Sequence, residues 1–144
     1  MSVFKHSVMI QRPIEEVFAF LHDPANDPVW QTGLVETKLS GPMGVGATLT
    51  EVRHFLGKRV ELTFEITEYE PPARSSRAII AGPVPIAAGY TLEPAGGGTN
   101  VTMVGETDAY GFFRLTEPVF ARMASRELEA NAGHLKDLLE TTSS

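Results

Sequence analysis

The clearest pattern of apolar and polar positions lies in the middle of the chain, between residues 59 and 67. Apolar residues occupy every second position there, and charged residues or threonines stand between them. A period of two places all the apolar side chains on one face of a strand, so this segment predicts a half-buried strand. Its apolar positions are Val60, Leu62, Phe64 and Ile66.

Shorter segments of the same kind, bounded by glycine and proline, predict six more strands. They cover residues 3–10, 34–39, 47–55, 76–81, 86–92 and 100–107. Turn residues separate the later segments, including Gly82-Pro83 and the run from Gly96 to Gly98. Short turns join antiparallel neighbours, so the segments from residue 34 onward predict an antiparallel meander.

The segment between the first two strands predicts two short helical elements. Pro13 suits the start of a helix, and the residue before Pro24 is pushed out of helical geometry. The apolar face of this first helix consists of Ile14, Val17, Phe18 and Leu21. The acidic and proline residues at 23–28 then predict a capped turn or a very short helix that leads to Trp30.

The last apolar pattern has a helical period. From residue 112 to residue 141, apolar residues recur at steps of three and four, which predicts one long helix. We expect a bend near Pro118, because proline has no N–H to give to the carbonyl of Arg114, and easier opening over residues 111–123. Alternatively, the helix begins at Pro118, with Thr116 or Glu117 as its cap.

Together these elements predict an α+β fold. We expect a curved antiparallel sheet of about seven strands wrapped around a long C-terminal helix, with two short helices after the first strand. Sheets of this size twist and curl, and a straight helix cannot fill a curled sheet. The sequence therefore predicts a cavity between the helix and the sheet.

Composition narrows the functional classes. The 144 residues suit a single domain, and a net charge of −6 without a dominant basic cluster argues against a nucleic-acid partner. The absence of cysteine excludes disulfides and thiol chemistry. No apolar run reaches the ~20 residues of a membrane span, and the N-terminus has no secretion signature, so we expect a cytoplasmic protein without stable membrane insertion.

Several motifs fall at the same places in the chain as in a known superfamily. They are the run from Pro13 to Leu21, Asp23-Pro24 followed by Trp30, Val45-Gly46, Phe55-Leu56-Gly57, the run from Glu68 to Pro72, Gly97-Gly98-Thr99, Glu127 and Leu135-Lys136. With the order of elements, they resemble the START-like (SRPBCC) superfamily over essentially the whole chain, and within it the bacterial polyketide cyclase/dehydrase and lipid-transport branch. The resemblance implies a helix-grip fold and an apolar ligand such as a lipid or polyketide, while only some members catalyse a reaction.

Other sites of chemistry lack support in the sequence. The glycines at 41, 44 and 46 lead into a strand rather than a helix, so they do not predict a nucleotide site. The four histidines show no metal-ligand spacing, and no nucleophile elbow is present. We therefore expect no cofactor and no metal.

The candidate ligand-binding residues are aromatic, sulfur-containing or weakly polar side chains predicted to face the cavity. They are Trp30, His54, Phe64, Tyr90, Met103, Phe120 and Met123. Tyr90 should lie opposite Met103 on the inner face. Glu106 has the opposite parity and is expected at the surface, although a register change near Gly105 would bring it inward.

The orientation of His54 depends on the turn that follows it. A three-residue turn at Leu56 to Lys58 pairs His54 with Val60 and points His54 inward. A two-residue turn instead sends Glu51 and Arg53 inward. We favour the first arrangement because burying Glu and Arg together is costly.

Two functions remain open. The first is binding or transport of a small apolar ligand by a monomer or homodimer, and the second is a polyketide cyclase or dehydratase that uses the same cavity. We favour binding, because no acid–base pair at fixed spacing is visible and no catalytic residue can be named.

Overall fold

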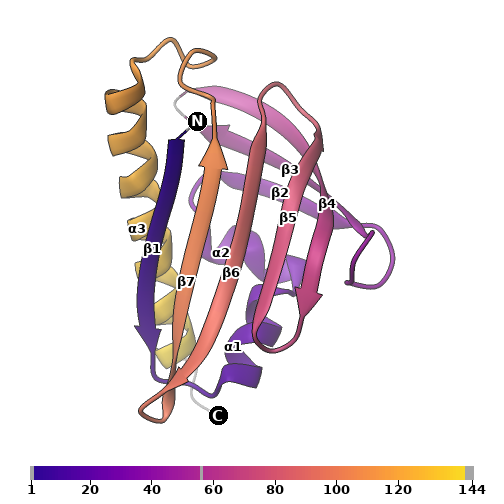
Figure 1. The fold of residues 1–144 in the computed structure, drawn as a ribbon, viewed down its shortest axis with the longest axis vertical. Coiled ribbons are helices and arrows are strands. Elements are labelled where there is room, and N and C mark those ends of the chain that lie inside the picture. Colours follow the sequence, from indigo (N-terminus) through magenta and orange to yellow (C-terminus); the bar gives the residue numbers. More distant parts are fainter. Residues whose placement is uncertain (1, 56, 142–144) are drawn as a thin grey trace.

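Over residues 2–55 and 57–141, which the computed structural model describes, the chain forms one antiparallel sheet of seven strands with helices on one face (Figure 1). The strands are β1 (Ser2–Ile10), β2 (Leu34–Leu39), β3 (Thr48–Phe55), β4 (Lys58–Glu70), β5 (Arg74–Ala81), β6 (Ile86–Ala95) and β7 (Gly98–Thr107). Their order is β1-β7-β6-β5-β4-β3-β2, so β1 closes the meander beside β7, and β1 and β2 form the two edges. The predicted α+β fold with about seven strands is confirmed.

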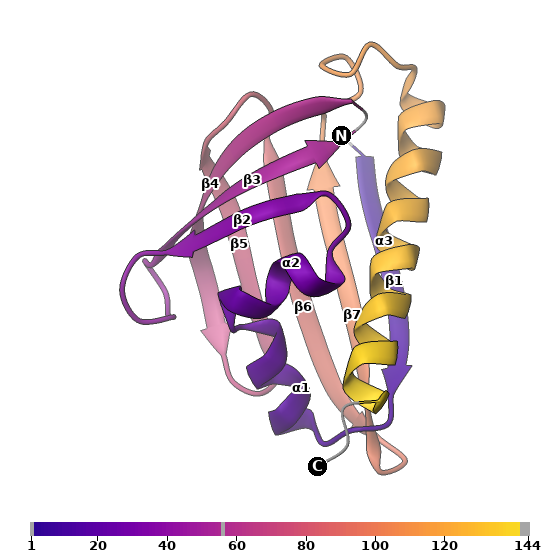
Figure 2. The same cartoon turned by 180° about the vertical axis from the view of Figure 1, so that it is seen from behind.

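The helices follow the predicted order. After β1 come α1 (Ile14–Leu21), the 3-10 turn η1 (Pro24–Asn26) and α2 (Asp27–Trp30), and α3 (Glu117–Thr141) ends the described chain. The Asp23 carboxylate caps η1 by accepting from the backbone N–H of Ala25 at 3.1 Å. Seen from behind, α1, α2 and α3 lie on the same face of the sheet (Figure 2).

The sheet curls strongly, so that β2, β3 and β4 cross above the short helices while β1 and β7 run alongside α3 (Figures 1 and 2). Irregularities in the ladder accompany this bend. The register shifts between Ile66 and Glu68 where β4 meets β5, and between Leu34 and Glu36 where β2 meets β3. An extra residue on one strand bends it and increases its twist, which lets a single sheet form a deep concave face.

The long helix begins later than residue 112, where the longer of the two predicted helices began. It begins at Glu117, and the backbone N–H of Phe120 donates to the carbonyl of Thr116 at 3.0 Å. Pro118 therefore lies in the first turn, where a helix needs no N–H from it, and Arg114 has a φ of 58° that is not helical. The expectation of a bend at Pro118 within a helix from residue 112 is wrong. The alternative, a helix that begins at Pro118 with Thr116 or Glu117 as its cap, agrees with the observed start at Glu117 to within one residue.

Side chains of α3 connect it to β1. Lys136 Nζ donates to the carbonyl oxygen of Met9 at 2.6 Å and also pairs with the Glu140 carboxylate at 2.7 Å. The same carboxylate accepts from the backbone N–H of Gln11 at 2.8 Å. Apolar residues of α3, including Leu135 and Leu139, are buried against the sheet. The C-terminal half of the helix is thus packed tightly, and the space within the fold lies nearer its N-terminal half.

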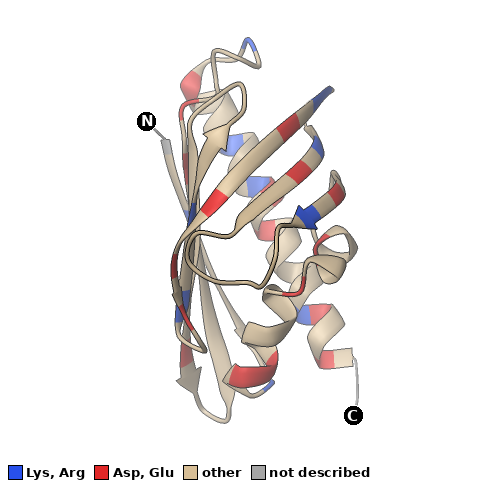
Figure 3. Ribbon diagram, turned by 90° about the vertical axis from the view of Figure 1, so that its right-hand side faces the viewer, with Lys and Arg blue, Asp and Glu red and all other residues tan. Residues whose placement is uncertain are grey.

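Charged residues are spread along the strands and along α3, with acidic and basic positions interspersed (Figure 3). Within the part of the chain that the structure describes, no helix is both long enough and apolar enough to cross a membrane.

Candidate ligand-binding cavity

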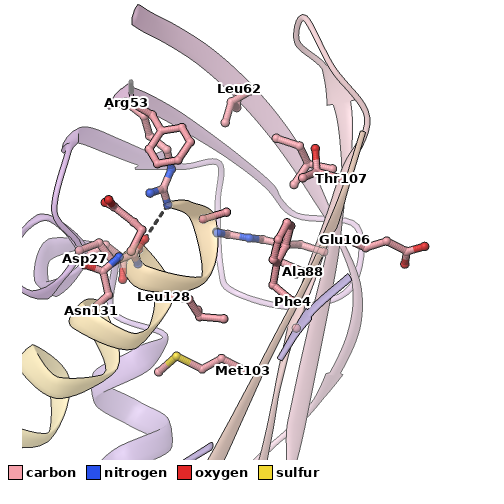
Figure 4. Close-up of a pocket in the computed structure, with 18 of the residues that line it drawn as sticks. Phe4, Asp27, Arg53, Leu62, Ala88, Met103, Glu106, Thr107, Leu128 and Asn131 are labelled. Atoms are coloured by element: carbon pink, nitrogen blue, oxygen red, sulfur yellow. Dashed lines mark hydrogen bonds between the residues drawn. The ribbon is translucent and has the colours of Figure 1, made fainter. Parts of the chain in front are cut away.

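A cavity of about 300 Å³ lies between the concave face of the sheet and the N-terminal half of α3 (Figure 4). Its volume is at the lower limit of small-molecule sites. The sheet contributes apolar positions such as Leu62, Ala88 and Met103, and α3 contributes Phe120, Ala124 and Leu128. Polar side chains gather in one part of the wall, and aromatic rings gather in another.

The aromatic part, which we call the aromatic cluster, consists of Phe4, Phe55, Ala109, Phe113 and Phe120. The rings of Phe113 and Phe120 stack with centroids 5.9 Å apart, and Phe55 meets both of them edge to face. Phe4 reaches Phe120 from β1, with the centroids 6.0 Å apart. The segment between β7 and α3 supplies Ala109 and Phe113, so it covers this part of the cavity.

The polar part of the wall contains Asp27, Gln31, Arg53, Arg77 and Tyr90. Together with Glu51, which is buried behind the wall and pairs with both arginines, they form what we call the polar cluster. At its centre is Glu51, whose side chain has no exposed surface. Arg53 Nε donates to Glu51 Oε1 at 2.9 Å, and Arg77 Nη1 donates to Glu51 Oε2 at 2.8 Å. Arg53 also donates through Nη2 to the Gln31 side-chain oxygen. One buried carboxylate thus holds two arginines, and both arginines border the cavity.

Burial alone would raise the pKa of Glu51. The charges and hydrogen bonds of Arg77 and Arg53 outweigh burial and hold that pKa below its ordinary value, so Glu51 stays ionised. The guanidinium of Arg77 also lies over the ring of Phe64, 4.5 Å from its centroid. Arg77 is therefore fixed from two sides, by a charge and by an aromatic face.

Asp27 is a carboxylate of the cavity wall that has no ion-pair partner within 4 Å among the described residues. It is 6% exposed, and burial raises its pKa to about 7 against the opposing charge of Arg77. The indole of Trp30 is near enough to lower that pKa slightly. Even so, Trp30 Nε1 is buried without a hydrogen bond of normal geometry to any described residue. Asp27 can therefore change its protonation state near neutral pH.

His22 and Tyr90 complete the polar wall. His22 Nδ1 donates to the carbonyl oxygen of Phe18 at 2.7 Å, and in the neutral ring Nε2 accepts from the hydroxyl of Ser75 at 2.6 Å. Burial lowers the pKa of His22, so the imidazole is neutral at physiological pH. Burial also raises the pKa of Tyr90 to about 12, so its phenol stays protonated and can donate a hydrogen bond.

The register of β3 and β4 overturns the predicted orientation of His54. Phe55 pairs with Lys58 and Arg53 pairs with Val60, so the hairpin has a two-residue turn that includes Gly57 with a φ of 81°. Leu56, the other turn residue, lies outside the described residues. Glu51 and Arg53 thus face inward and His54 is exposed. The expected cost of burying Glu51 with Arg53 is offset because Arg77 from β5 gives Glu51 a second positive partner.

Comparison with protein families places the chain. Residues 1–140 match the family described as polyketide cyclase / dehydrase and lipid transport. The chain belongs to this family. No curated protein sequence matches the chain closely enough to add a more specific assignment.

Solved structures share the fold of this family member at low sequence identity. TTHA0849 from Thermus thermophilus is 17% identical with a TM-score of 0.83, and the match covers 99% of this chain and 100% of that one. A START superfamily protein from Mycobacterium smegmatis is 14% identical with a TM-score of 0.82, covering 98% and 99%. The Aha1 dimer from Colwellia psychrerythraea is 19% identical with a TM-score of 0.72, covering 100% of both chains. At these identities the likeness shows the START-like fold alone.

The cavity brings together most of the candidate residues named from the sequence. Trp30, His54, Tyr90, Met103 and Phe120 are among the residues that line it. Tyr90 pairs with Met103 across β6 and β7 as predicted. His54 lies at the border with an exposed side chain. That any of these residues binds a ligand stays a prediction.

Two of the candidate residues, Phe64 and Met123, do not line the cavity. Phe64 is 2% exposed and packs with Leu49 and Leu62 beneath Arg77, so it supports the wall without being among the lining residues. Met123 is 38% exposed on α3 and is likewise not among the described residues that line the cavity. Glu106 borders the cavity, but its side chain is exposed and extends outward, as its parity predicted (Figure 4).

Sequence reasoning missed Asp27 and Arg77 as site residues. Asp27 was interpreted as a turn residue, because its burial depends on packing that the sequence does not display. The sequence did contain a signal for Arg77. Arg77 lies two residues after Ser75 and two residues before Ile79, so in a strand all three share one face. A charge at an inward strand position needs an opposite partner, and Glu51 was available.

The described residues contain no group of three His, Asp or Glu side chains that could hold a metal ion. The polar cluster instead offers guanidinium, phenol and carboxyl groups. These groups suit the binding of an organic ligand through hydrogen bonds and charge.

Proposed function

We propose that this protein binds or carries a small apolar ligand, of lipid or polyketide type, in the cavity between the sheet and α3. One observation carries the proposal. A cavity of about 300 Å³ has a largely apolar wall, and its polar groups gather in one region. Such a wall removes apolar ligand surface from water, while the polar groups orient one end of the ligand. Membership of the lipid-transport family supports the same ligand class.

A matched pair of substitutions on α3 tests this proposal. Ala124 lines the cavity, whereas Ala130 is exposed on the same helix. Ala124→Phe should fill the space and weaken binding of the neutral fluorescent probe N-phenyl-1-naphthylamine about tenfold or more, while Ala130→Phe should change it less than about twofold. Equal effects of the two variants, or saturable binding of ATP with no response to the probe, would rule out an apolar cavity ligand.

Native mass spectrometry of the protein purified from its source identifies the chemical class directly. We expect a retained molecule with an apolar body. It should be absent from Ala124→Phe prepared in the same way.

A second candidate is a polyketide cyclase or dehydratase, and Asp27 is the observation that favours it. Its pKa of about 7 suits a group that accepts and returns a proton near neutral pH. Incubation with a poly-β-ketone substrate should then give a cyclised or dehydrated product with the native protein and none with Asp27→Asn. Unchanged substrate in both cases leaves binding as the function.

A further inference from the structure

The two arginines at the cavity, Arg53 and Arg77, differ in how many partners they have. Arg53 and Arg77 share the single buried carboxylate of Glu51. Arg53 also donates a hydrogen bond to Gln31. On α3, burial raises the pKa of the half-buried Glu127 carboxyl, and the nearby charge of Arg53 opposes that rise. Arg77 is different, because its single side-chain hydrogen bond within the described residues goes to Glu51. Its other N–H groups remain available at a wall of the cavity.

Asp27 on α2 and Tyr90 on β6 lie in the field of Arg77. The charge of Arg77 lowers the pKa of both groups, the charge of Asp27 raises the pKa of Tyr90, and all three residues line the cavity. The neutral imidazole of His22, the residue that follows α1, borders the same region. When Asp27 is ionised, it acts as the second counter-charge for the two arginines. When Asp27 is protonated, that counter-charge is lost, and the anionic group of a ligand can supply it instead.

We propose that the cavity takes an amphiphile with an apolar body and a terminal carboxylate, and that this carboxylate binds Arg77 beside Tyr90 while Asp27 takes up a proton. The proposal rests on the proposed function and names its ligand class. A carboxylate matches the planar fork of a guanidinium, which a neutral alcohol cannot do. Tyr90 and protonated Asp27 then act as hydrogen-bond donors to it.

Proton uptake follows from the repulsion of like charges. Glu51 stays ionised because both arginines hold it, whereas Asp27 has no ion-pair partner among the described residues, so a ligand carboxylate placed at Arg77 adds a negative charge that favours the protonated form of Asp27. Ligand binding therefore raises the pKa of Asp27 above its value of about 7 in the free protein. Affinity for the carboxylate should be constant below that pKa and should fall about tenfold for each pH unit above it, until the pKa of the complex is reached.

Decanoate and decanol are the probes, because they share an apolar chain and differ at one end. Each competes with N-phenyl-1-naphthylamine from about pH 6 to about pH 9. We expect decanoate to lose at least about tenfold in affinity over this range and decanol to change less than about threefold. Calorimetry in two buffers of different ionisation enthalpy should show an uptake approaching one proton per decanoate above pH 7, and much less for decanol.

Substitutions assign the effect to these residues. Asp27→Asn should bind decanoate with an affinity that no longer depends on pH and without proton uptake. Arg77→Lys keeps the charge but loses the fork, so it should reduce the preference for decanoate over decanol about tenfold. Arg59→Lys on the exposed face of β4 is the matched control and should leave the preference within about twofold.

The outcomes separate this proposal from the proposed function. If the naphthylamine and decanol bind but decanoate shows no proton uptake, or Asp27→Asn keeps the pH slope of the native protein, the carboxylate site is refuted and apolar binding stands. If none of the three probes binds, the proposed function fails, and this proposal fails with it.

Discussion

The two clusters that border the cavity adjoin each other on β3 and differ in how they are held together. Arg53 belongs to the polar cluster and Phe55, two residues later on the same face, belongs to the aromatic cluster. The polar cluster depends on specific partners, because one carboxylate supports two guanidiniums. The aromatic cluster depends on volume and contact, which several apolar side chains can supply.

This difference shows where the cavity can vary and where it cannot. Apolar contacts are individually weak and have no fixed direction, so the aromatic cluster can accept a different shape at modest cost. A buried ion cluster fails when one member is lost, because the others are left unpaired in a medium of low dielectric constant. Ligand shape should therefore be set by the aromatic cluster, while the polar cluster keeps one arrangement.

Glu51→Gln tests how strongly the polar cluster depends on its central carboxylate, and we expect it to have the largest effect. The substitution preserves shape but leaves Arg53 and Arg77 without a negative partner, so we expect a loss of roughly 3–5 kcal/mol in the free energy of unfolding. Urea denaturation at neutral pH measures it. Glu61→Gln, on the exposed face of β4, should change the same quantity by less than about 0.5 kcal/mol. Similar small values for both variants would show that the buried ion cluster does not stabilise the fold.

Asp27→Asn should stabilise the protein at high pH. The folded-state pKa of about 7 lies above the ordinary value of 3.8, so the folded state binds more protons between these values and native stability falls as pH rises. Below that window Asp27 is protonated in both states, and above it the cost of burying the charge is complete. At about pH 8 we expect the variant to be more stable by roughly 3–4 kcal/mol, and near pH 4 to show little difference.

Urea denaturation across this pH range makes the measurement, and Asp137→Asn on the exposed side of α3 is the control. A stability difference between native protein and Asp27→Asn that does not grow with pH would contradict the buried, titrating carboxyl.

Phe120→Met tests the tolerance of the aromatic cluster. The flexible side chain keeps most of the volume and can repack against Phe4, Phe55 and Phe113, so the loss in unfolding free energy should stay below about 1.5 kcal/mol. Affinity for N-phenyl-1-naphthylamine should shift more than stability does, because Phe120 lines the cavity. A loss as large as that of Glu51→Gln would remove the contrast between the two clusters.

Pro118→Ala should have the smallest effect. Pro118 occupies the first turn of α3, where no hydrogen bond is missing, so the change should alter stability by less than about 0.5 kcal/mol. Ligand exchange should also keep its rate, since Arg114 is not in helical geometry. Stopped-flow displacement of the naphthylamine probe is the measurement. A clear slowing would restore the idea that Pro118 weakens the start of the helix.

The architecture could be predicted because its signals are local. The alternation at Val60, Leu62, Phe64 and Ile66 reflects a period of two, and the stripe through Leu135 and Leu139 reflects a period near 3.6. Turn residues then fix the order of the strands. Even the orientation of Tyr90 followed from parity, because β6 and β7 pair without a register shift.

The site could be predicted only in part, because its polar groups depend on contacts between distant segments. Whether His54 or the Glu51–Arg53 pair faces the cavity depends on whether the turn after β3 has three residues or two. The sequence does not fix that length, so the prediction relied on the assumed cost of burying the pair. That cost was misjudged because Arg77, 26 positions after Glu51, was not counted as a partner. The burial of Asp27 likewise depends on how α2 docks below the curled sheet, which no local pattern encodes.

The two edge strands, β1 and β2, also determine whether the protein aggregates by strand addition at high concentration. A free strand edge is a template on which a second chain can add a strand. Along β1, α3 is tied to the strand region through Lys136 and Glu140, and an incoming chain would have to displace that helix. Along β2, the exposed pair of Glu36 and Lys38, 3.0 Å apart, and the shifted register present charge and an uneven ladder. Fibrillar growth by strand addition is therefore disfavoured at both edges, so the protein can keep an incompletely filled interior without its sheet serving as a seed.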